Sequence, residues 1–162
     1  PPPAPAPPPP ARVTAIGDSV MLGAHGALQA VIGNGLALDA AVSRQFDQAL
    51  AVVRLLHDAG QLGERVVMHM GNNGIIRPDQ FDQMMQMLAG VPRVVVVNAN
   101  VARPWEGPVN DVLASGVPRY PNAVLVDWKA VAVQHPELFV EDGIHLQTGG
   151  ALVYADLIAH SL

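Results

Sequence analysis

The side chain best suited to nucleophilic chemistry is that of Ser19, in the run GDSV at positions 17–20. A serine that leaves a strand and opens a helix lies beside unpaired backbone N–H groups, which favour the negative charge of an oxyanion. Asp18 and Ser19 are also ordinary helix-capping residues. Taken alone, the run therefore indicates a helix cap at least as strongly as a nucleophile.

A base for that hydroxyl stands near the end of the chain, in the run EDGIH at 141–145. Asp142 precedes His145 by three residues, and Gly143 lets the chain fold back so that the carboxylate reaches imidazole Nδ1. That contact would fix the tautomer and leave Nε2 free to accept a proton. A loop with a surface histidine is the alternative interpretation.

A third polar run, GNNG at 71–74, follows a short apolar stretch. Two glycines around two asparagines form a turn that reaches positive φ, and turn chemistry alone accounts for this composition. In the functional interpretation, one Asn amide points across the strand ends and donates a hydrogen bond to a developing oxyanion. The nearby His69 is expected to be a packed core histidine bonded to backbone.

The elements that must position these residues are read from apolar runs that alternate with amphipathic stretches. We expect strands at 12–16, 36–41, 65–70, 93–99 and 123–128. We expect helices at 19–32, 45–60, 78–89, 108–115 and 148–161, the last capped by Thr148. This alternation predicts a three-layer α/β/α sandwich with a five-stranded parallel sheet, of the flavodoxin-like type.

Such folds build their sites at the carboxyl ends of the strands, and all three polar runs fall at that edge. Their coincidence favours one site over three unrelated turns. On the second helix, an apolar stripe is expected from Phe46, Leu50, Val53 and His57. Core filling is expected from Met84, Met85 and Met87. No spacing typical of a metal site is found among His25, His57, His135 and His160, and the sequence implies no cofactor.

The composition narrows the classes of function. The 162 residues suffice for one domain, and the net charge of −5 without a basic cluster argues against nucleic-acid binding. Cysteine is absent, which excludes disulfides and thiolate metal sites, and the apolar runs are too short to span a bilayer. Residues 1–10 include eight prolines and predict a polyproline linker or a disordered tail before a domain at 11–162.

Together, Gly17-Asp18-Ser19, Gly71-x-Asn73 and Asp142-x-x-His145 resemble sequence blocks of the SGNH (GDSL-type) hydrolases, over roughly residues 12–160. The chain is most similar to the SGNH domains that follow a membrane acyltransferase-3 domain and O-acetylate cell-wall or surface polysaccharides. Three features carry that similarity: Val20-Met21 after the serine, the stretch VARPWE at 101–106 followed by Val109-Asn110, and the proline-rich spacer.

By position, the resemblance implies Ser19 as nucleophile, His145 as general base and Asp142 as its orienting carboxylate. The oxyanion hole would comprise the Ser19 backbone N–H, the Asn73 side chain and a backbone N–H from Ser43. Ser43 stands where the general family carries a glycine.

Two further residues are candidates for substrate contact. Trp105 either stacks on a sugar ring beside the site or packs against the sheet. Arg103 is placed to meet a carboxylate or a polar edge of the substrate.

These residues predict serine-dependent acyl transfer, with acetyl as the expected group, to hydroxyls of an extracytoplasmic glycan such as peptidoglycan or surface polysaccharide. The expected partners are that glycan and an acyl donor, delivered by an upstream membrane acyltransferase domain that also tethers the protein. A carbohydrate or lipid esterase with the same triad is the alternative. A non-catalytic domain that binds glycan or a partner is a third hypothesis, against which the intact Ser19, Asp142 and His145 count.

Overall fold

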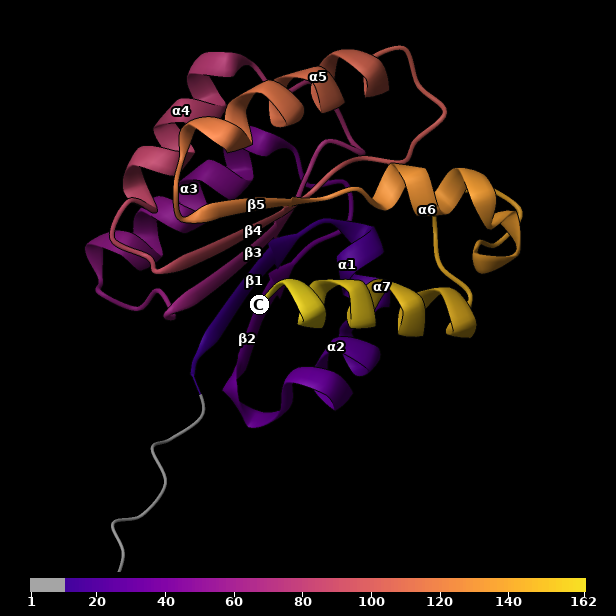
Figure 1. The fold of residues 1–162 in the computed structure, drawn as a ribbon, viewed down its shortest axis with the longest axis horizontal. Helices are drawn as coiled ribbons and strands as arrows, with labels where there is room; N and C mark the ends of the chain where they lie inside the picture. The colour runs from indigo at the N-terminus through magenta and orange to yellow at the C-terminus, as the bar shows by residue number, and fades with distance from the viewer. Residues whose placement is uncertain (1–10) are drawn as a thin grey trace, which may run out of the picture.

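A parallel sheet of five strands forms the centre of the molecule (Figure 1). The computed structural model describes residues 11–162, so the proline-rich segment 1–10 and its predicted role as a linker lie outside the described residues. The strand order is β2-β1-β3-β4-β5, and every neighbouring pair is parallel. The strands are β1 (Val13–Gly17), β2 (Leu36–Ala40), β3 (Arg65–His69), β4 (Arg93–Val97) and β5 (Ala123–Val126).

The central strands are short valine-rich runs, and in β3 and β4 every residue after the first is buried. Such continuous apolar runs are typical of parallel strands covered on both faces. Gly17 pairs in register with His69, and His69 with Val97. Since these strands end at one level, the loops that follow them emerge side by side at one edge.

Helices cover both faces of the sheet and complete the predicted three-layer sandwich (Figure 1). One layer holds α3 (Phe46–Asp58), α4 (Pro78–Met87) and α5 (Glu106–Gly116). The other holds α1 (Ser19–Gly23), α2 (His25–Ile32), α6 (Trp128–Gln134) and α7 (Thr148–Ser161). Short 3₁₀ turns are η1 (Gly33–Gly35), η2 (Val117–Arg119) and η3 (Pro136–Leu138). Within residues 11–162, no helix combines the length and apolar character needed to cross a membrane.

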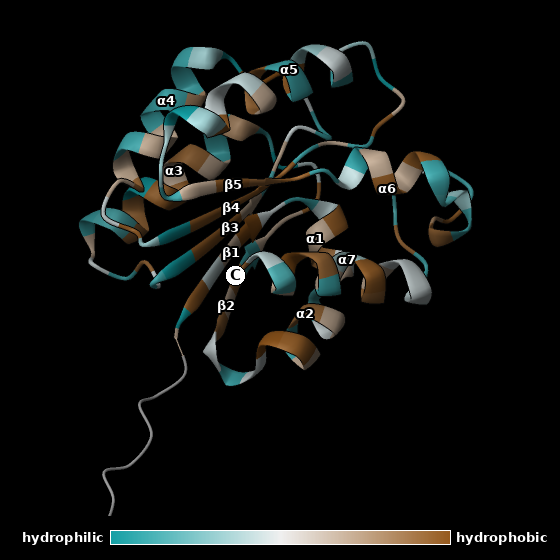
Figure 2. Cartoon of the chain, in the orientation of Figure 1, coloured by the Kyte–Doolittle hydropathy of each residue, from teal (hydrophilic) through white to brown (hydrophobic). Residues whose placement is uncertain are grey.

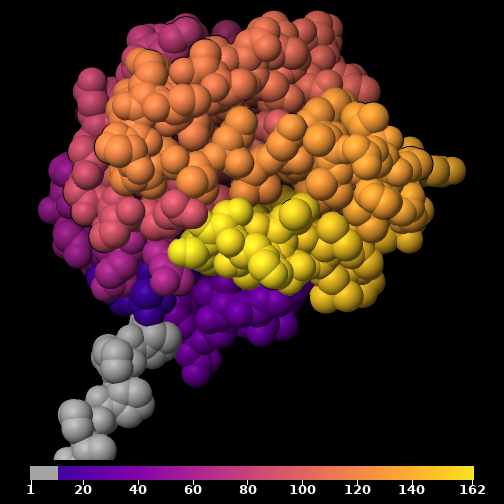
Figure 3. Space-filling view, viewed as in Figure 1, coloured from indigo at the N-terminus to yellow at the C-terminus, as the bar shows by residue number. Residues whose placement is uncertain are grey.

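Hydropathy follows this layering. Figure 2 shows strongly apolar strands in the middle and polar colours on the outer turns of α3 and α4. Two apolar clusters flank the sheet, one beneath α3, α4 and α5 and the other beneath α2, α6 and α7. Figure 3 shows α7 as a continuous band across the surface, between the α6 region and the N-terminal helices. Burial of these helix faces is the main source of stability in such a fold.

Most predicted elements shift by one or two residues at their ends, and two differences have a clear local cause. The helix expected at 19–32 is divided at Ala24, whose N–H is shared between the carbonyls of Val20 and Met21. The strand expected to reach residue 128 ends at Val126, because Asp127 caps a helix that the sequence analysis missed. The Asp127 carboxylate accepts a hydrogen bond from the Ala130 N–H, which fixes the start of α6.

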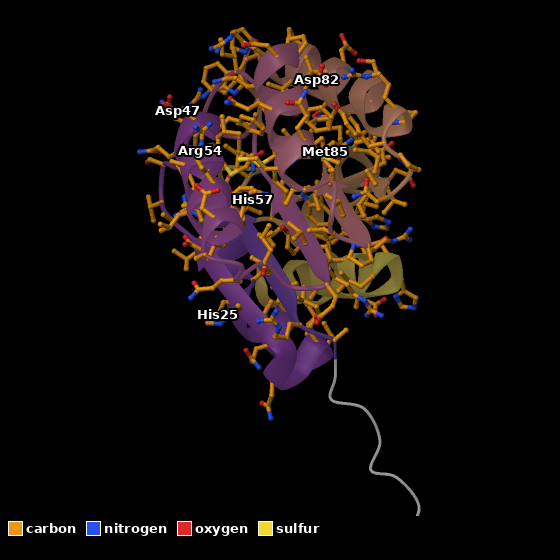
Figure 4. The ribbon with its side chains drawn as sticks, turned by 90° about the vertical axis from the view of Figure 1, so that its left-hand side faces the viewer. His25, Asp47, Arg54, His57, Asp82 and Met85 are labelled. Carbon is orange, nitrogen blue, oxygen red and sulfur yellow. The ribbon has the colours of Figure 1, made fainter. Side chains whose placement is uncertain are left out.

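Three side-chain predictions on the helices have mixed outcomes. His57 is exposed rather than part of the buried stripe, and Figure 4 shows it on the outer side of α3 with Arg54. Helix α7 is preceded by Gln147 as its N-cap, so Thr148 is its first residue rather than its cap. Met84 and Met85 are fully buried, which confirms their predicted place in the core.

Candidate active site

The turn from β1 into α1 presents Ser19 at the catalytic edge. The carboxylate of Asp18 is fully buried and accepts a 3.0 Å hydrogen bond from the Val20 N–H, so Asp18 is the N-cap of α1. Gly17 is required here because a Cβ at this position would lie 2.6 Å from Cβ of Met21. The tight turn leaves the Ser19 hydroxyl partly exposed at the end of a rigid central strand.

His145 meets Ser19 across 126 positions of sequence, with Asp142 on the far side of its imidazole ring. Ser19 Oγ lies 2.9 Å from His145 Nε2, and His145 Nδ1 lies 2.6 Å from Asp142 Oδ2. The other carboxylate oxygen of Asp142 accepts hydrogen bonds from the N–H groups of Ile144 and His145. The hydrogen bond from the His145 side chain is the largest cause that lowers the pKa of Asp142 from 3.8 to about 2. Asp142 therefore stays ionised and can hold the imidazole in the tautomer with a free Nε2.

The loop that carries this pair is short and closes on itself. Phe139 and Leu146 form an isolated antiparallel bridge at its base. Gly143 reaches φ 70° between Asp142 and His145, as the predicted fold-back requires. Asn100, from the loop after β4, donates a 3.0 Å hydrogen bond to the Gly143 carbonyl.

The loop after β3 brings Asn73 to the same place. Gly71 has φ 111°, and a Cβ there would lie 2.6 Å from Val109, so the turn depends on glycine. The side-chain Nδ2 of Asn73 is buried and has no hydrogen-bond partner among the described residues. An unpaired buried donor is costly unless something accepts from it, and a substrate oxyanion is such an acceptor.

A cavity of about 250 Å³ lies at this edge of the sheet. It is lined by Ser19, Asn72, Asn73, Val101, Arg103, Trp105, Ile144 and His145. Three of the predicted site residues, Ser19, Asn73 and His145, thus share one cavity, with Asp142 directly behind the imidazole.

The two candidate substrate residues both line this cavity. Arg103 is exposed at its mouth. Trp105 is half-buried against the core cluster beneath α3, α4 and α5, and its Nε1–H donates to the Gly71 carbonyl at 3.1 Å. Trp105 therefore packs against the core, in line with one of its two predicted roles, while part of its ring still faces the cavity. A contact of either residue with a sugar stays a prediction.

Ser43 lies in the loop between β2 and α3, exposed and outside the set that lines the cavity. It has φ 59°, and within residues 11–162 no other residue besides glycine has a positive φ. This left-handed conformation favours glycine, the residue that the general family carries at this point. Arg44 holds the loop against β1 and β2, through the carbonyls of Gly17 and Asp39. A donor role for the Ser43 N–H stays a prediction.

A buried polar network beneath the site was missed by the sequence analysis. It joins Asp18 to Asn72, Asn72 to His69, and His69 to Tyr154 of α7. His69 is fully buried, as predicted, and burial is the largest cause that lowers its pKa below 6.5, against the neighbouring Asp18 carboxylate. No local sequence pattern predicts this network, because its members come from three segments that are far apart in the sequence.

Larger hollows lie away from this edge, on the outer surface of α3 and α4 (Figure 4). They measure about 410 and 510 Å³, and both are lined by Arg54 and Asp58. Neither is lined by a nucleophile beside a base, so the smaller cavity, which contains Ser19 and His145, is the candidate active site. In the part of the chain that the structure describes, no three His, Cys, Asp or Glu side chains cluster closely enough to hold a metal ion.

Comparison with known proteins identifies the class of protein. No protein-family model matches the chain. Its fold is that of AlinE4, an SGNH-hydrolase family esterase, with a TM-score of 0.61 at 13% identity over 92% of this chain and 93% of that one. The chain has the fold of the SGNH (GDSL-type) hydrolases, as the sequence motifs predicted.

Within that class the chain is homologous to peptidoglycan O-acetyltransferases. The C-terminal catalytic domain of peptidoglycan O-acetyltransferase A (OatA) from Streptococcus pneumoniae, solved with a methylsulfonyl adduct, superposes with a TM-score of 0.79. It is 27% identical, over 93% of this chain and 92% of that one. The "Putative peptidoglycan O-acetyltransferase YrhL" of Bacillus subtilis strain 168 is 37% identical over 151 residues, or 93% of this chain. The chain spans 24% of the length of that relative.

Proposed function

We propose that this chain is a serine O-acyltransferase that moves an acetyl group to hydroxyl groups of peptidoglycan through an acyl-serine intermediate. The observation that carries the proposal is the continuous line of contacts from Ser19 Oγ to His145 and on to Asp142, at 2.9 and 2.6 Å. The homology to proteins named peptidoglycan O-acetyltransferases supports acetyl as the group and peptidoglycan as the acceptor.

In the first half-reaction Ser19 takes the acetyl group from its donor. His145 Nε2 accepts the hydroxyl proton while Oγ attacks the acetyl carbonyl carbon. The carbonyl oxygen becomes an oxyanion that accepts hydrogen bonds from the Ser19 N–H and Asn73 Nδ2. The tetrahedral intermediate then collapses, and the donor's leaving group departs with the proton from His145. Asp142, ionised throughout, stabilises the imidazolium between these two steps.

The second half-reaction reverses these roles. A glycan hydroxyl gives its proton to His145 Nε2 and attacks the acetyl-serine carbonyl. Collapse of the second tetrahedral intermediate releases Ser19, which recovers a proton from His145, and leaves an acetylated sugar. Water in place of the sugar hydroxyl yields free acetate instead, so exclusion of water decides between transfer and hydrolysis.

The cavity supports a short acyl group. Its volume of about 250 Å³ lies below the range of about 300–1,000 Å³ for sites that enclose drug-sized ligands. Arg103 and Trp105 at its mouth offer a cation and an aromatic ring, which are suited to the polar edge and the apolar face of a sugar.

An esterase with the same triad is the second candidate, and one observation favours it. The side chains of Asp142 and His145 are 45% and 48% exposed, so water from solvent can reach the His145 imidazole. The SGNH esterase AlinE4 also shares the fold.

Peptidoglycan lies outside the cytoplasm, and we place the proposed reaction there. Delivery of the acetyl group by an upstream membrane domain, which would also tether this one, is part of the proposal and rests on the sequence resemblance.

Two measurements test the proposed function. Ser19→Ala is expected to abolish turnover of p-nitrophenyl acetate and labelling by methanesulfonyl fluoride, read by intact-protein mass spectrometry. Wild-type turnover in that variant would overturn the nucleophile assignment. Acetylated product and free acetate are then measured with a peptidoglycan oligosaccharide present. A dominant transfer product supports the transferase, and acetate alone supports the esterase.

A further inference from the structure

A buried ion–amide contact joins the two loops that carry the proposed oxyanion donors. Asn72 Nδ2 donates a 3.0 Å hydrogen bond to Asp18 Oδ2. Asp18 is 0% exposed and Asn72 is 6% exposed, so little solvent competes with this contact. Each partner directly precedes a site residue, because Asp18 is followed by Ser19 and Asn72 by Asn73.

Both partners make a further contact, while Asn72 Oδ1 is buried without a hydrogen-bond partner among the described residues. Asp18 Oδ1 accepts from the Val20 N–H, which holds the carboxylate against the first turn of α1. Asn72 Nδ2 also lies 3.4 Å from His69 Nε2, and His69 Nδ1 lies 2.8 Å from the Tyr154 hydroxyl. A carboxylate accepts only, so the Asn72 amide must turn its nitrogen toward Asp18.

We propose that the Asp18–Asn72 pair is a positioning device, which fixes the spacing between the Ser19 backbone N–H and Asn73 Nδ2. This inference rests on the proposed function, because it assumes that these two groups stabilise the oxyanion. Pre-organised donors act only when they are held at the place where charge develops. Loss of the pair therefore lowers kcat more than it alters KM.

The chain contains a second asparagine–aspartate contact at the same edge of the sheet, in which the carboxylate is exposed rather than buried. Asn98 is also 6% exposed, and its Nδ2 donates a 2.8 Å hydrogen bond to Asp127, the N-cap of α6. It does not line the cavity that holds Ser19. Asn98 Oδ1 also accepts a 2.8 Å hydrogen bond from the Lys129 N–H. Asn98→Ala therefore removes an amide–carboxylate contact and this second hydrogen bond at a helix start that carries no proposed donor.

The test compares kcat, KM and melting temperature for p-nitrophenyl acetate in the full 162-residue chain. Asn72→Ala is expected to lower kcat by at least about tenfold and to change KM less than about threefold. The reason is that the two oxyanion donors, the Ser19 N–H and Asn73 Nδ2, are no longer held at their spacing. Asn98→Ala is expected to lower the melting temperature by a similar amount and to keep kcat within about threefold. Equal losses of kcat in the two variants would overturn the inference.

An exchange of the two groups supplies a second test. Asn72→Asp leaves two carboxylates opposed and is expected to lose kcat and stability, whereas Asp18→Asn leaves two amides that can still pair through one oxygen and one nitrogen. The double variant restores an amide opposite a carboxylate, and we expect its kcat to exceed that of the worse single variant at least about tenfold. A folded double variant no better than that single variant contradicts the inference.

Failure of the proposed function itself has a different signature. Asn73→Ala tests the oxyanion donor directly, and wild-type kcat in this variant removes the role on which the inference rests. If Asn73→Ala loses about 10²-fold in kcat while Asn72→Ala behaves as Asn98→Ala does, the oxyanion assignment stands and only the positioning role fails.

Discussion

Asn100 donates a hydrogen bond from Nδ2 to the backbone carbonyl of Gly143 at 3.0 Å, which ties the loop after β4 to the loop that carries Asp142 and His145. The loop that carries His145, the base of the proposed triad, is thus held by Asn100, while the Asp142 carboxylate holds the imidazole ring itself. This contact spans 43 positions and falls on a residue that no sequence pattern singled out.

We expect Asn100→Ala to lower kcat/KM about five- to tenfold, because a hydrogen bond of this kind contributes about 1 kcal/mol to the ordering of the loop. Steady-state hydrolysis of p-nitrophenyl acetate measures the change. Asn34→Ala, at an exposed position in η1, is the control. Equal activity of the Asn100 variant and wild type would show that the loop orders itself without this contact.

Asp142→Asn is expected to lower kcat on the order of 10⁴-fold, since an amide no longer enforces the productive tautomer of His145. The pKa of Asp142 is lowered from 3.8 to about 2, chiefly by the hydrogen bond from His145. The carboxylate is therefore ionised from pH 4 upward, and the wild-type pH–rate profile should contain no step from Asp142 between pH 4 and 9. A carboxylate ionisation in that range, lost in Asp142→Asn, would contradict this.

His69 should make stability depend on pH. Burial lowers its pKa in the folded chain below 6.5, so the unfolded chain binds the proton first as pH falls. The free energy of unfolding contributed by neutral His69 is full above about pH 6.5 and is lost below it, by at most about 1.4 kcal/mol per pH unit. Urea unfolding between pH 5 and 7.5 should show a shallower dependence in His69→Gln than in wild type.

Ser43 is expected to act through its backbone, so Ser43→Gly and Ser43→Ala should keep kcat within about threefold. Glycine adopts φ 59° without strain, and both residues retain the N–H. Ser43→Pro removes the N–H and cannot adopt a positive φ, and we expect a loss of about 10²-fold in kcat. Full activity of Ser43→Pro, with melting temperature recorded, would exclude this residue from the oxyanion hole.

The parts of the molecule that could be predicted from sequence are those encoded locally. Valine runs specify β3 and β4, and register at the strand ends then places Ser19 and Asn73 side by side. His145 reaches them from the loop between η3 and α7. Helix α6 was missed although Asp127 is an ordinary N-cap residue, because the apolar run before it was extended to residue 128.

Two features lay beyond local patterns. The Asp18, Asn72, His69 and Tyr154 network depends on which side chains three separated segments bring together, and spacing along the chain does not encode that. Ser43 was found only through the family resemblance, since an exposed serine in a loop carries no signal for a positive φ.

A short loop closed by the Phe139–Leu146 bridge carries Asp142 and His145, and we expect its local stability to be lower than that of the strand before Ser19. Ser19 follows a central strand, whereas His145 belongs to an exposed loop, 140–147, in which Leu146 is the residue that packs against an apolar cluster. On warming, we expect the loop to move His145 away from Ser19 before the sheet unfolds, so that loss of activity precedes global unfolding. Amide hydrogen exchange should reveal this as faster exchange over 140–147 than in β1. We therefore expect the upper temperature limit of activity to be set by the eight residues 140–147 rather than by the core.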